Sequence, residues 1–260
     1  MSDQHITLTI EDGCAELRIE RPHKRNALTR AMWRELGEAI AAVAASPDVR
    51  LLVLRGSGGV FSAGADIAEM GEFLADPVQL AANNALVRDT QLALERLGCM
   101  TLAAVEGACV GGGCGLALAC DFRLATEDAR FAITPARLGL LYSAEDVRRV
   151  VGVVGATRAR QLLLTAQPID AATALAWGML TEVCAASALP ARIEARRALA
   201  AQVSPYSVAG IKRAIAMLGG AEPADFAALG QLFDDAFHQD DFREGAQAFL
   251  ERRAPRFRSQ

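Results

Sequence analysis

The 260-residue sequence lacks features that mark several classes of protein. Its net charge is −4 and it has no long run of Lys or Arg, so the charge pattern does not favour a nucleic acid or an anionic membrane as partner. A membrane-spanning helix needs about 18 or more consecutive apolar residues, and no such run occurs. Only three residues are His, and they are widely spaced, so we expect no metal site.

The six cysteines contain no C-x-x-C pair and have no His cluster near them. Four lie in strongly apolar stretches, where a free thiol behaves as a small hydrophobic group. The first residues, MSDQH, have neither the basic nor the apolar segment of a secretory signal peptide. We therefore expect a reduced, cytoplasmic protein.

The organisation of the chain changes at about residue 189. Before it, predicted strands and helices alternate, which favours an α/β core with crossover connections over residues 1–188. After it, strand signals stop and four helical segments follow, near 190–202, 205–218, 223–238 and 240–252. The region 189–260 is therefore predicted to be helical, and its apolar positions either cover the core or pack against another subunit.

Several elements can be predicted individually. Residues 6–10 and 14–19 alternate apolar and polar side chains around a Gly-containing turn, which is typical of a β-hairpin. Thr29 is a suitable N-cap for a helix that continues to about residue 45. The runs 49–54 and 101–105 are apolar without alternation and predict strands buried on both faces. Residues 131–142 read as irregular, and 145–151 and 157–165 read as two helices.

A glycine-rich turn between a buried strand and a buried helix is the most informative stretch, residues 105–115 (VEGACVGGGCG). Five of its last nine residues are Gly, which permits positive φ and close approach to the backbone. No Lys follows the glycines and there is no G-x-G-x-x-G, so neither common phosphate-binding loop is present. The alternatives are a tight structural turn, or a backbone N–H directed at a developing negative charge.

A second turn of the same kind occurs at residues 61–67 (FSAGADI), again between an apolar strand and a predicted helix. Two such turns can each supply one backbone N–H group. Two convergent N–H donors are what a thioester carbonyl oxygen needs as the thioester becomes an enolate. The pair therefore indicates chemistry on a thioester more strongly than either turn alone.

These two turns, with L138-G-L140, the segment 152–163, R21-P22 with N26-A-L28 and the segment 171–178, resemble the enoyl-CoA hydratase/isomerase (crotonase) superfamily over essentially the whole chain. The resemblance implies an α/β fold that is a crotonase-like spiral of ββα units with a C-terminal helical region. It also implies an acyl-CoA thioester as substrate, with coenzyme A as part of the substrate rather than a separate cofactor, and a homotrimer or hexamer.

The resemblance also implies site residues by position. The N–H groups of Ala65 and Gly112 would bind the thioester oxygen. For Asp66 we favour a carboxylate that begins a helix. The resemblance places ten residues along the acyl-CoA, and two of them, Phe249 and Arg252, at a neighbouring subunit's CoA. The other eight are Lys24, Arg25, Ala27, Ala63, Asp66, Ile67, Gly111 and Pro135.

Two departures from the family pattern bear on the reaction. The resemblance places the two glutamates that hold and activate water in the hydratases at the positions of Gly115 and Pro135 here. Neither residue can move a proton, so efficient ordinary hydration is not expected. The stretch around Tyr142 resembles methylmalonyl-CoA decarboxylase, in which loss of CO2 would form the enolate without a base.

The identity of the proton carrier stays open at this stage. Tyr142 is either a positioning group or a core aromatic residue, and Glu145 and Asp146 are either proton carriers or the acidic first turn of a helix. A non-catalytic acyl-CoA-binding subunit is the alternative to a lyase or isomerase. The acyl pocket is expected to be walled by Phe73, Leu74, Leu86 and Tyr142.

Overall fold

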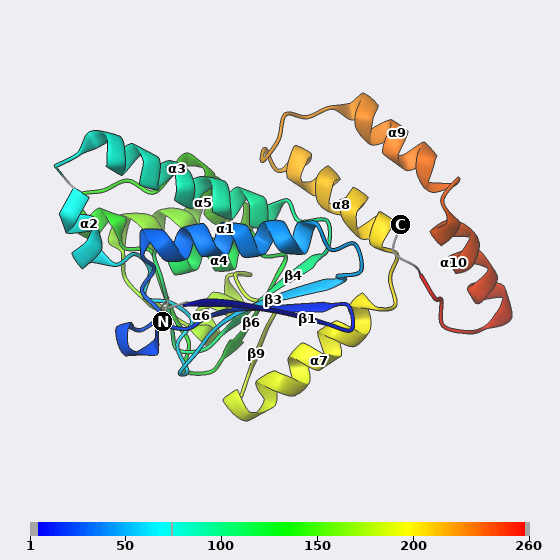
Figure 1. Ribbon diagram of the computed structural model, residues 1–260, viewed down its shortest axis with the longest axis horizontal. Coiled ribbons are helices and arrows are strands. Elements are labelled where there is room, and N and C mark those ends of the chain that lie inside the picture. The colour runs from blue at the N-terminus through cyan, green and yellow to red at the C-terminus, as the bar shows by residue number, and fades with distance from the viewer. Residues whose placement is uncertain (1–4, 74, 258–260) are drawn as a thin grey trace.

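A six-stranded sheet forms the centre of the computed structural model, which describes residues 5–73 and 75–257 (Figure 1). The predicted pocket position Leu74 lies outside these residues, and the side chain of Phe73 is not described. The strands, in spatial order, are β1 (Ile6–Glu11), β2 (Cys14–Ile19), β3 (Leu51–Gly56), β4 (Met100–Val105), β6 (Phe122–Thr126) and β9 (Glu182–Cys184). The first pair is antiparallel and all later pairs are parallel.

The predicted hairpin at the start of the chain is confirmed. Asp12 and Gly13 both have positive φ, 47° and 75°, and Glu11 pairs with Cys14 across this two-residue turn. Positive φ at both central positions matches the right-handed twist of the flanking strands. The alternation in β2 buries Ala15, Leu17 and Ile19.

The central strands are buried on both faces, as the unbroken apolar runs predict. In β3, Leu52 and Leu54 belong to the larger hydrophobic cluster, whereas Leu51 and Val53 belong to a second cluster that includes Leu189. Successive residues of a strand point to opposite faces, so each face of the sheet needs its own cover. A parallel sheet covered in this way is usual in α/β proteins.

Helices supply that cover (Figure 1). On one side lie α1 (Arg30–Ala44), α3 (Pro77–Glu95), α4 (Gly112–Ala119) and α5 (Ala144–Thr165). On the other lies α7 (Leu189–Ala200), which packs against β3, β4 and β6. Thr29 caps α1 by accepting a hydrogen bond from the Met32 N–H at 3.3 Å, as expected. The short helices α2 (Ile67–Phe73) and α6 (Ala171–Ala176) complete this part of the chain.

A second, three-stranded sheet is formed by β5 (Ala108–Val110), β7 (Arg130–Ala132) and β8 (Ile169–Asp170). The expectation that the chain is irregular from residue 131 is wrong at its start, because β7 pairs in parallel with β5. Strands of two or three residues are too short to have a readable hydrophobic period, so only the tertiary pairing identifies them. A 3-10 turn, Pro135–Leu138, follows β7.

The helix α5 joins the two helices predicted over 145–151 and 157–165. It is not regular throughout, because Gly155 has φ 74° and ψ 160° within it. The glycine at the kink therefore separates two helical segments of one continuous element. The Ser143 hydroxyl caps the start of α5 by accepting the Asp146 N–H at 3.0 Å.

The last helices, α8 (Pro205–Leu218), α9 (Phe226–Ala236) and α10 (Asp240–Glu251), stand to one side of the core (Figure 1). An ion pair ties α8 to the core, because Lys212 Nζ donates to Asp121 Oδ2 at 2.6 Å and to the Cys99 carbonyl at 2.8 Å. The boundary predicted at residue 189 falls at the start of α7, which packs on the sheet. None of the described helices is both long and apolar enough to cross a membrane.

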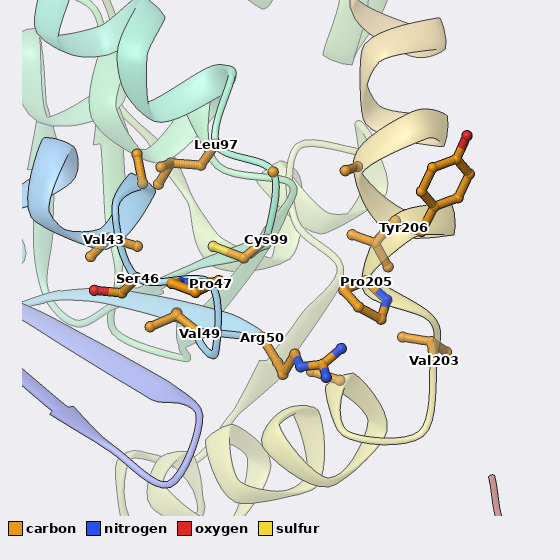
Figure 2. A pocket seen from close by; sticks show the side chains of 15 residues that line it. Val43, Ser46, Pro47, Val49, Arg50, Leu97, Cys99, Val203, Pro205 and Tyr206 are labelled. Atoms are coloured by element: carbon orange, nitrogen blue, oxygen red, sulfur yellow. The ribbon is translucent and has the colours of Figure 1, made fainter. Parts of the chain in front are cut away.

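A cavity of about 250 Å³ separates the start of α8 from the core at the amino end of β3. Figure 2 shows Val49 and Arg50 on the core side and Val203 and Pro205 on the other. The Tyr206 hydroxyl is directed elsewhere and donates to the Leu232 carbonyl of α9 at 3.3 Å. This cavity lies at the opposite end of the parallel strands from the cavity that Ala65 and Gly112 line.

Candidate functional site

The two glycine-rich turns meet beyond the carboxyl ends of β3 and β4. Ser62 and Cys109 form an isolated parallel bridge, in which the Val110 N–H donates to the Ser62 carbonyl and the Ser62 N–H donates to the Ala108 carbonyl, both at 2.9 Å. Gly64 has φ 89°, and a β-carbon placed on it would lie 2.7 Å from the Val110 oxygen and 3.4 Å from the Gly112 nitrogen. Glycine is therefore required where the turns touch.

The N–H groups of Ala65 and Gly112 remain available beside this contact. Leu28 bonds to both neighbours of Ala65, because its N–H donates to the Gly64 carbonyl at 2.7 Å and its carbonyl accepts the Asp66 N–H at 2.9 Å. Gly112 is the first residue of α4, where an N–H has no intrahelical acceptor. Within the described part of the chain, neither N–H group donates to a protein acceptor.

Both residues line one cavity of about 360 Å³. Its walls come from the start of α1, from α2, from α3, from the first turn of α4 and from the segment 141–146. Its walls combine apolar side chains, such as Trp33 and Leu141, with polar and charged ones. The lining residues are Leu28, Arg30, Trp33, Ala65, Glu69, Met70, Asn83, Asn84, Val87, Arg88, Gln91, Gly112, Leu141, Tyr142, Ser143, Glu145 and Asp146.

The predicted CoA-binding loop lies next to the first turn. Lys24 and Arg25 are exposed, and Ala27 is partly buried. The Ala63 N–H donates to the Arg25 carbonyl at 2.9 Å, which fixes the loop against the turn. The buried Asn26 side chain holds the same loop, since its amide donates to the carbonyls of residues 57 and 60 at 2.9 and 2.6 Å.

Asp66 begins α2, as the sequence analysis favours. Its Oδ1 accepts the N–H groups of Ala68 and Glu69 at 3.1 and 3.3 Å, and its Oδ2 is 2.6 Å from Arg21 Nη1. The hydrogen bond from Arg21 is the main cause that lowers the pKa of this carboxyl. Asp66, Ala63 and the exposed Ile67 do not line the cavity.

Tyr142 and Glu145 reach the cavity from the segment before α5 and from its first turn. The Tyr142 hydroxyl donates to the Gly111 carbonyl at 3.0 Å, and burial raises the pKa of this phenol. Gly111, with φ 52°, caps α4. Pro135 begins the 3-10 turn after β7 and does not line the cavity.

The two predicted residues of α10 lie elsewhere. Phe249 is 83% exposed and Arg252 is exposed, and α10 is at the opposite end of the molecule from α2 (Figure 1). They are therefore not brought to this chain's own cavity.

A buried polar cluster lies against Gly115, at a place that sequence reasoning largely missed. A β-carbon on Gly115 would contact the Gln91 side-chain nitrogen and lie 3.0 Å from Asp146 Oδ1. Arg149 links the two, since its Nη1 donates to Asp146 Oδ1 at 2.9 Å and to Gln91 Oε1 at 3.2 Å. Its Nε also donates to Glu95 Oε2 at 2.8 Å.

One signal in the sequence indicates this cluster. The buried positions of α3 include Asn83, Thr90 and Gln91 beside Leu94, so a polar stripe faces the interior. An amphipathic helix normally turns its polar side outward, and an inward polar stripe marks a site or a buried network.

Comparison with known proteins assigns the family. The family model described as enoyl-CoA hydratase/isomerase matches residues 9–260. The chain belongs to the enoyl-CoA hydratase/isomerase family. An acyl-CoA-processing role follows from that membership. The crotonase-like α/β fold that the sequence resemblance implies is confirmed.

Relatives and solved structures agree with this membership. The chain is 32% identical over 262 residues to a crotonyl-CoA hydratase of Syntrophomonas wolfei, covering 99% of each protein. It is 32% identical over 258 residues to an (E)-benzylidenesuccinyl-CoA hydratase of Thauera aromatica, covering 97% of this chain and 98% of that one. An enoyl-CoA hydratase/carnithine racemase structure from Magnetospirillum magneticum superposes with a TM-score of 0.93 at 29% identity, covering 100% of this chain and 97% of the other.

The space over Gly115 generates a prediction about stability. Replacing Gly115 by Ala should destabilise the fold by about 1–3 kcal/mol, because the new methyl group must displace the buried Gln91 amide. Gly152→Ala is the matched control, since its β-carbon meets no atom of the described residues within 4 Å and lies on an exposed helical position. There the same change should stabilise by about 0.5–1 kcal/mol. Urea unfolding measures both, and equal stability of the two variants would contradict the packing described here.

Proposed function

We propose that this protein is an enzyme that converts a CoA thioester through an enolate, as a lyase or isomerase. The N–H groups of Ala65 and Gly112 form an oxyanion hole for the thioester oxygen. The observation that carries the proposal is that both donors open into one cavity and neither is bonded to an acceptor among the residues that the structure describes. Preorganised donors of this kind stabilise the charge that develops in the transition state.

Hydration by two glutamates is not part of this proposal. Gly115 supplies no side chain, and its space is filled by Gln91 and Asp146. Pro135 lies outside the cavity lining. Water addition needs a base for the water and an acid for the α-carbon, and neither position provides one.

Decarboxylation, which the sequence around Tyr142 suggests, is less well supported as the reaction than proton transfer at the α-carbon. Decarboxylation is favoured by an apolar environment that disfavours the substrate carboxylate. Beside its apolar walls, the cavity here carries groups that bind or move protons, among them Gln91, Glu145 and Asp146. The Tyr142 hydroxyl also donates a hydrogen bond to the Gly111 carbonyl. It is therefore not free to donate to a substrate carboxylate.

The CoA moiety is proposed to extend from the cavity past the loop of Lys24 and Arg25. Exposed cations suit phosphate groups, and the contact of this loop with Ala63 places it beside the turn that supplies one N–H donor. Ala27, Asp66 and Ile67 would flank this path. Coenzyme A belongs to the substrate, so no separate cofactor is proposed.

The helical region is proposed to assemble a homotrimer or hexamer. Large apolar side chains of α8–α10 are exposed in a single chain, and exposed apolar patches commonly mark interfaces. Phe249 and Arg252 would then approach a neighbouring subunit's CoA. The exposed apolar residues are Ile211, Ile215, Leu218, Phe226, Phe233, Phe237, Phe242, Phe249 and Leu250.

The oxyanion hole can be tested by removing one N–H group. Gly112→Pro deletes the donor at the first position of α4, where proline suits a helix. We expect the rate of deuterium exchange at the α-carbon of butyryl-CoA in D2O, followed by proton NMR, to fall about 100- to 1000-fold.

Gly112→Ala is the matched control, because it keeps the N–H group and adds the same β-carbon near Trp33. The proposal predicts that the Pro variant is far slower than the Ala variant. Similar rates in the two variants would contradict it. A wild-type protein that binds CoA esters but neither exchanges this proton nor converts any enoyl-CoA or malonyl-type thioester would instead be a non-catalytic binding subunit.

The phosphate-binding loop predicts a graded loss of affinity. Lys24→Ala and Arg25→Ala should each weaken CoA binding by roughly two- to fivefold, less at high salt, because exposed ion pairs contribute little and are screened. Isothermal titration calorimetry gives the Kd values. Arg213→Ala, an exposed cation on α8, should leave the affinity unchanged, and an equal loss there would indicate a non-specific charge effect.

The assembly predicts a mass of three or six chains in sedimentation equilibrium. Phe226→Ser should reduce that mass, because Phe226 is 73% exposed in one chain on the helical region. Leu164→Ser, at a position 75% exposed on α5, should not. A monomeric wild-type protein would contradict the assembly proposed for these helices.

A further inference from the structure

An unpartnered donor marks the inner end of the cavity. The Gln91 side chain is 1% exposed, and its Oε1 is bonded to Arg149. Its Nε2 has no hydrogen-bond partner among the residues that the structure describes. Leaving a buried donor unbonded is costly, and Gln91 lines the cavity, so its free N–H2 group indicates an acceptor atom of a ligand or a water beside it.

A fixed carboxylate stands beside this donor. Asp146 is 5% exposed and lines the cavity. Its Oδ2 accepts the Ser143 hydroxyl at 2.8 Å, and its Oδ1 accepts Arg149 Nη1 at 2.9 Å. A carboxylate bonded at both oxygens is held in one orientation, which a proton-transfer group needs.

Both groups lie close to the proposed oxyanion hole. They converge on the position that a side chain at residue 115 would occupy. Gly112 is three residues earlier on α4, a rise of about 4.5 Å along the helix axis. The α-carbon of a thioester is bonded to the carbonyl carbon, so an oxygen at the Gly112 N–H places the α-carbon within reach of this cluster.

The surroundings of Asp146 suit a group that both accepts and releases a proton. Burial is the main cause that raises the pKa of its carboxyl, against the lowering effect of the bonds from Ser143 and Arg149. Glu145 on the same helix raises this pKa further. Other ionisable groups beside the cluster are Tyr142 before α5 and Glu95 from α3, and on α4 the thiol of Cys114 lies near Tyr142.

The other proton carriers of the cavity are less well placed. Glu145 is only partly buried and makes no side-chain hydrogen bond with the described residues, so its orientation is not fixed. The Tyr142 hydroxyl is bonded to Gly111, and its raised pKa keeps it protonated.

We propose that Asp146 is the proton carrier of this site and that Gln91 Nε2 donates a hydrogen bond to an oxygen beside the reacting carbon. This inference rests on the proposed enolate chemistry. The ionised Asp146 takes a proton from the α-carbon, the C–H electron pair moves into the enolate, and the thioester oxygen becomes negative at the two N–H groups. The protonated Asp146 then returns a proton to carbon.

The test is α-carbon deuterium exchange of butyryl-CoA in D2O, with the full chain. Asp146→Asn should lower the exchange rate about 100- to 10,000-fold, the usual contribution of general acid–base catalysis, with the Kd of butyryl-CoA little changed. Asp128→Asn is the matched control, the same substitution at an exposed position outside the cavity lining, and should keep the rate. Circular dichroism shows whether each variant is folded.

The pH profile separates proton transfer from a structural role. The wild-type rate should fall as the pH drops through the raised pKa of Asp146, because only the ionised carboxylate accepts the proton. The residual rate of Asp146→Asn should lack this limb. Ser143→Ala keeps the carboxyl but removes a bond that lowers its pKa, so the limb should move to higher pH.

The outcomes distinguish the role of Asp146 from the enolate chemistry itself. Exchange in Asp146→Asn at the wild-type rate, or a wild-type limb unmoved by Ser143→Ala, overturns the role of Asp146. If Gly112→Pro is still slow relative to Gly112→Ala in that case, the enolate chemistry stands with another proton carrier. A wild-type protein that binds butyryl-CoA without exchange overturns both proposals.

Discussion

The contact between two strand-to-helix turns is the constraint on which the site depends. The backbone bridge between Ser62 and Cys109 brings the turns together. Because Gly64 has no β-carbon, its turn can pack closely against the backbone next to Gly112. Each turn alone would present one open N–H group. Only their pairing places the N–H groups of Ala65 and Gly112 in one cavity.

The rest of the fold holds these turns in place. The parallel strands end at one edge of the sheet, so the segments that follow β3 and β4 begin side by side. Hydrophobic clusters cover both faces of the sheet, which makes the strand ends rigid supports. Loops that carry function are usually positioned by a rigid scaffold of this kind.

The polar cluster beside the turns occupies a buried position that apolar side chains usually fill. Glu95, Asp146, Arg149 and Gln91 are packed where an apolar core would be more stable, and burial of charge is costly unless the charges are paired and hydrogen-bonded. Here two carboxylates offset the Arg149 charge. The absence of a side chain at Gly115 gives the cluster its room. Gly115 thus supplies no functional group itself, and the side chains of Gln91 from α3 and Asp146 from α5 fill the space.

The sequence by itself determined the long elements, the capping of α1 by Thr29, the hairpin and the presence of two glycine-rich turns, because these follow from local periodicity and turn chemistry. Tertiary structure alone decided the short strands of the second sheet, whose length carries no period. It also decided that Gln91 and Asp146 meet over Gly115, although these residues are 55 positions apart in the chain. Long-range packing creates such a cluster, and no local pattern encodes which distant side chains will share one buried space.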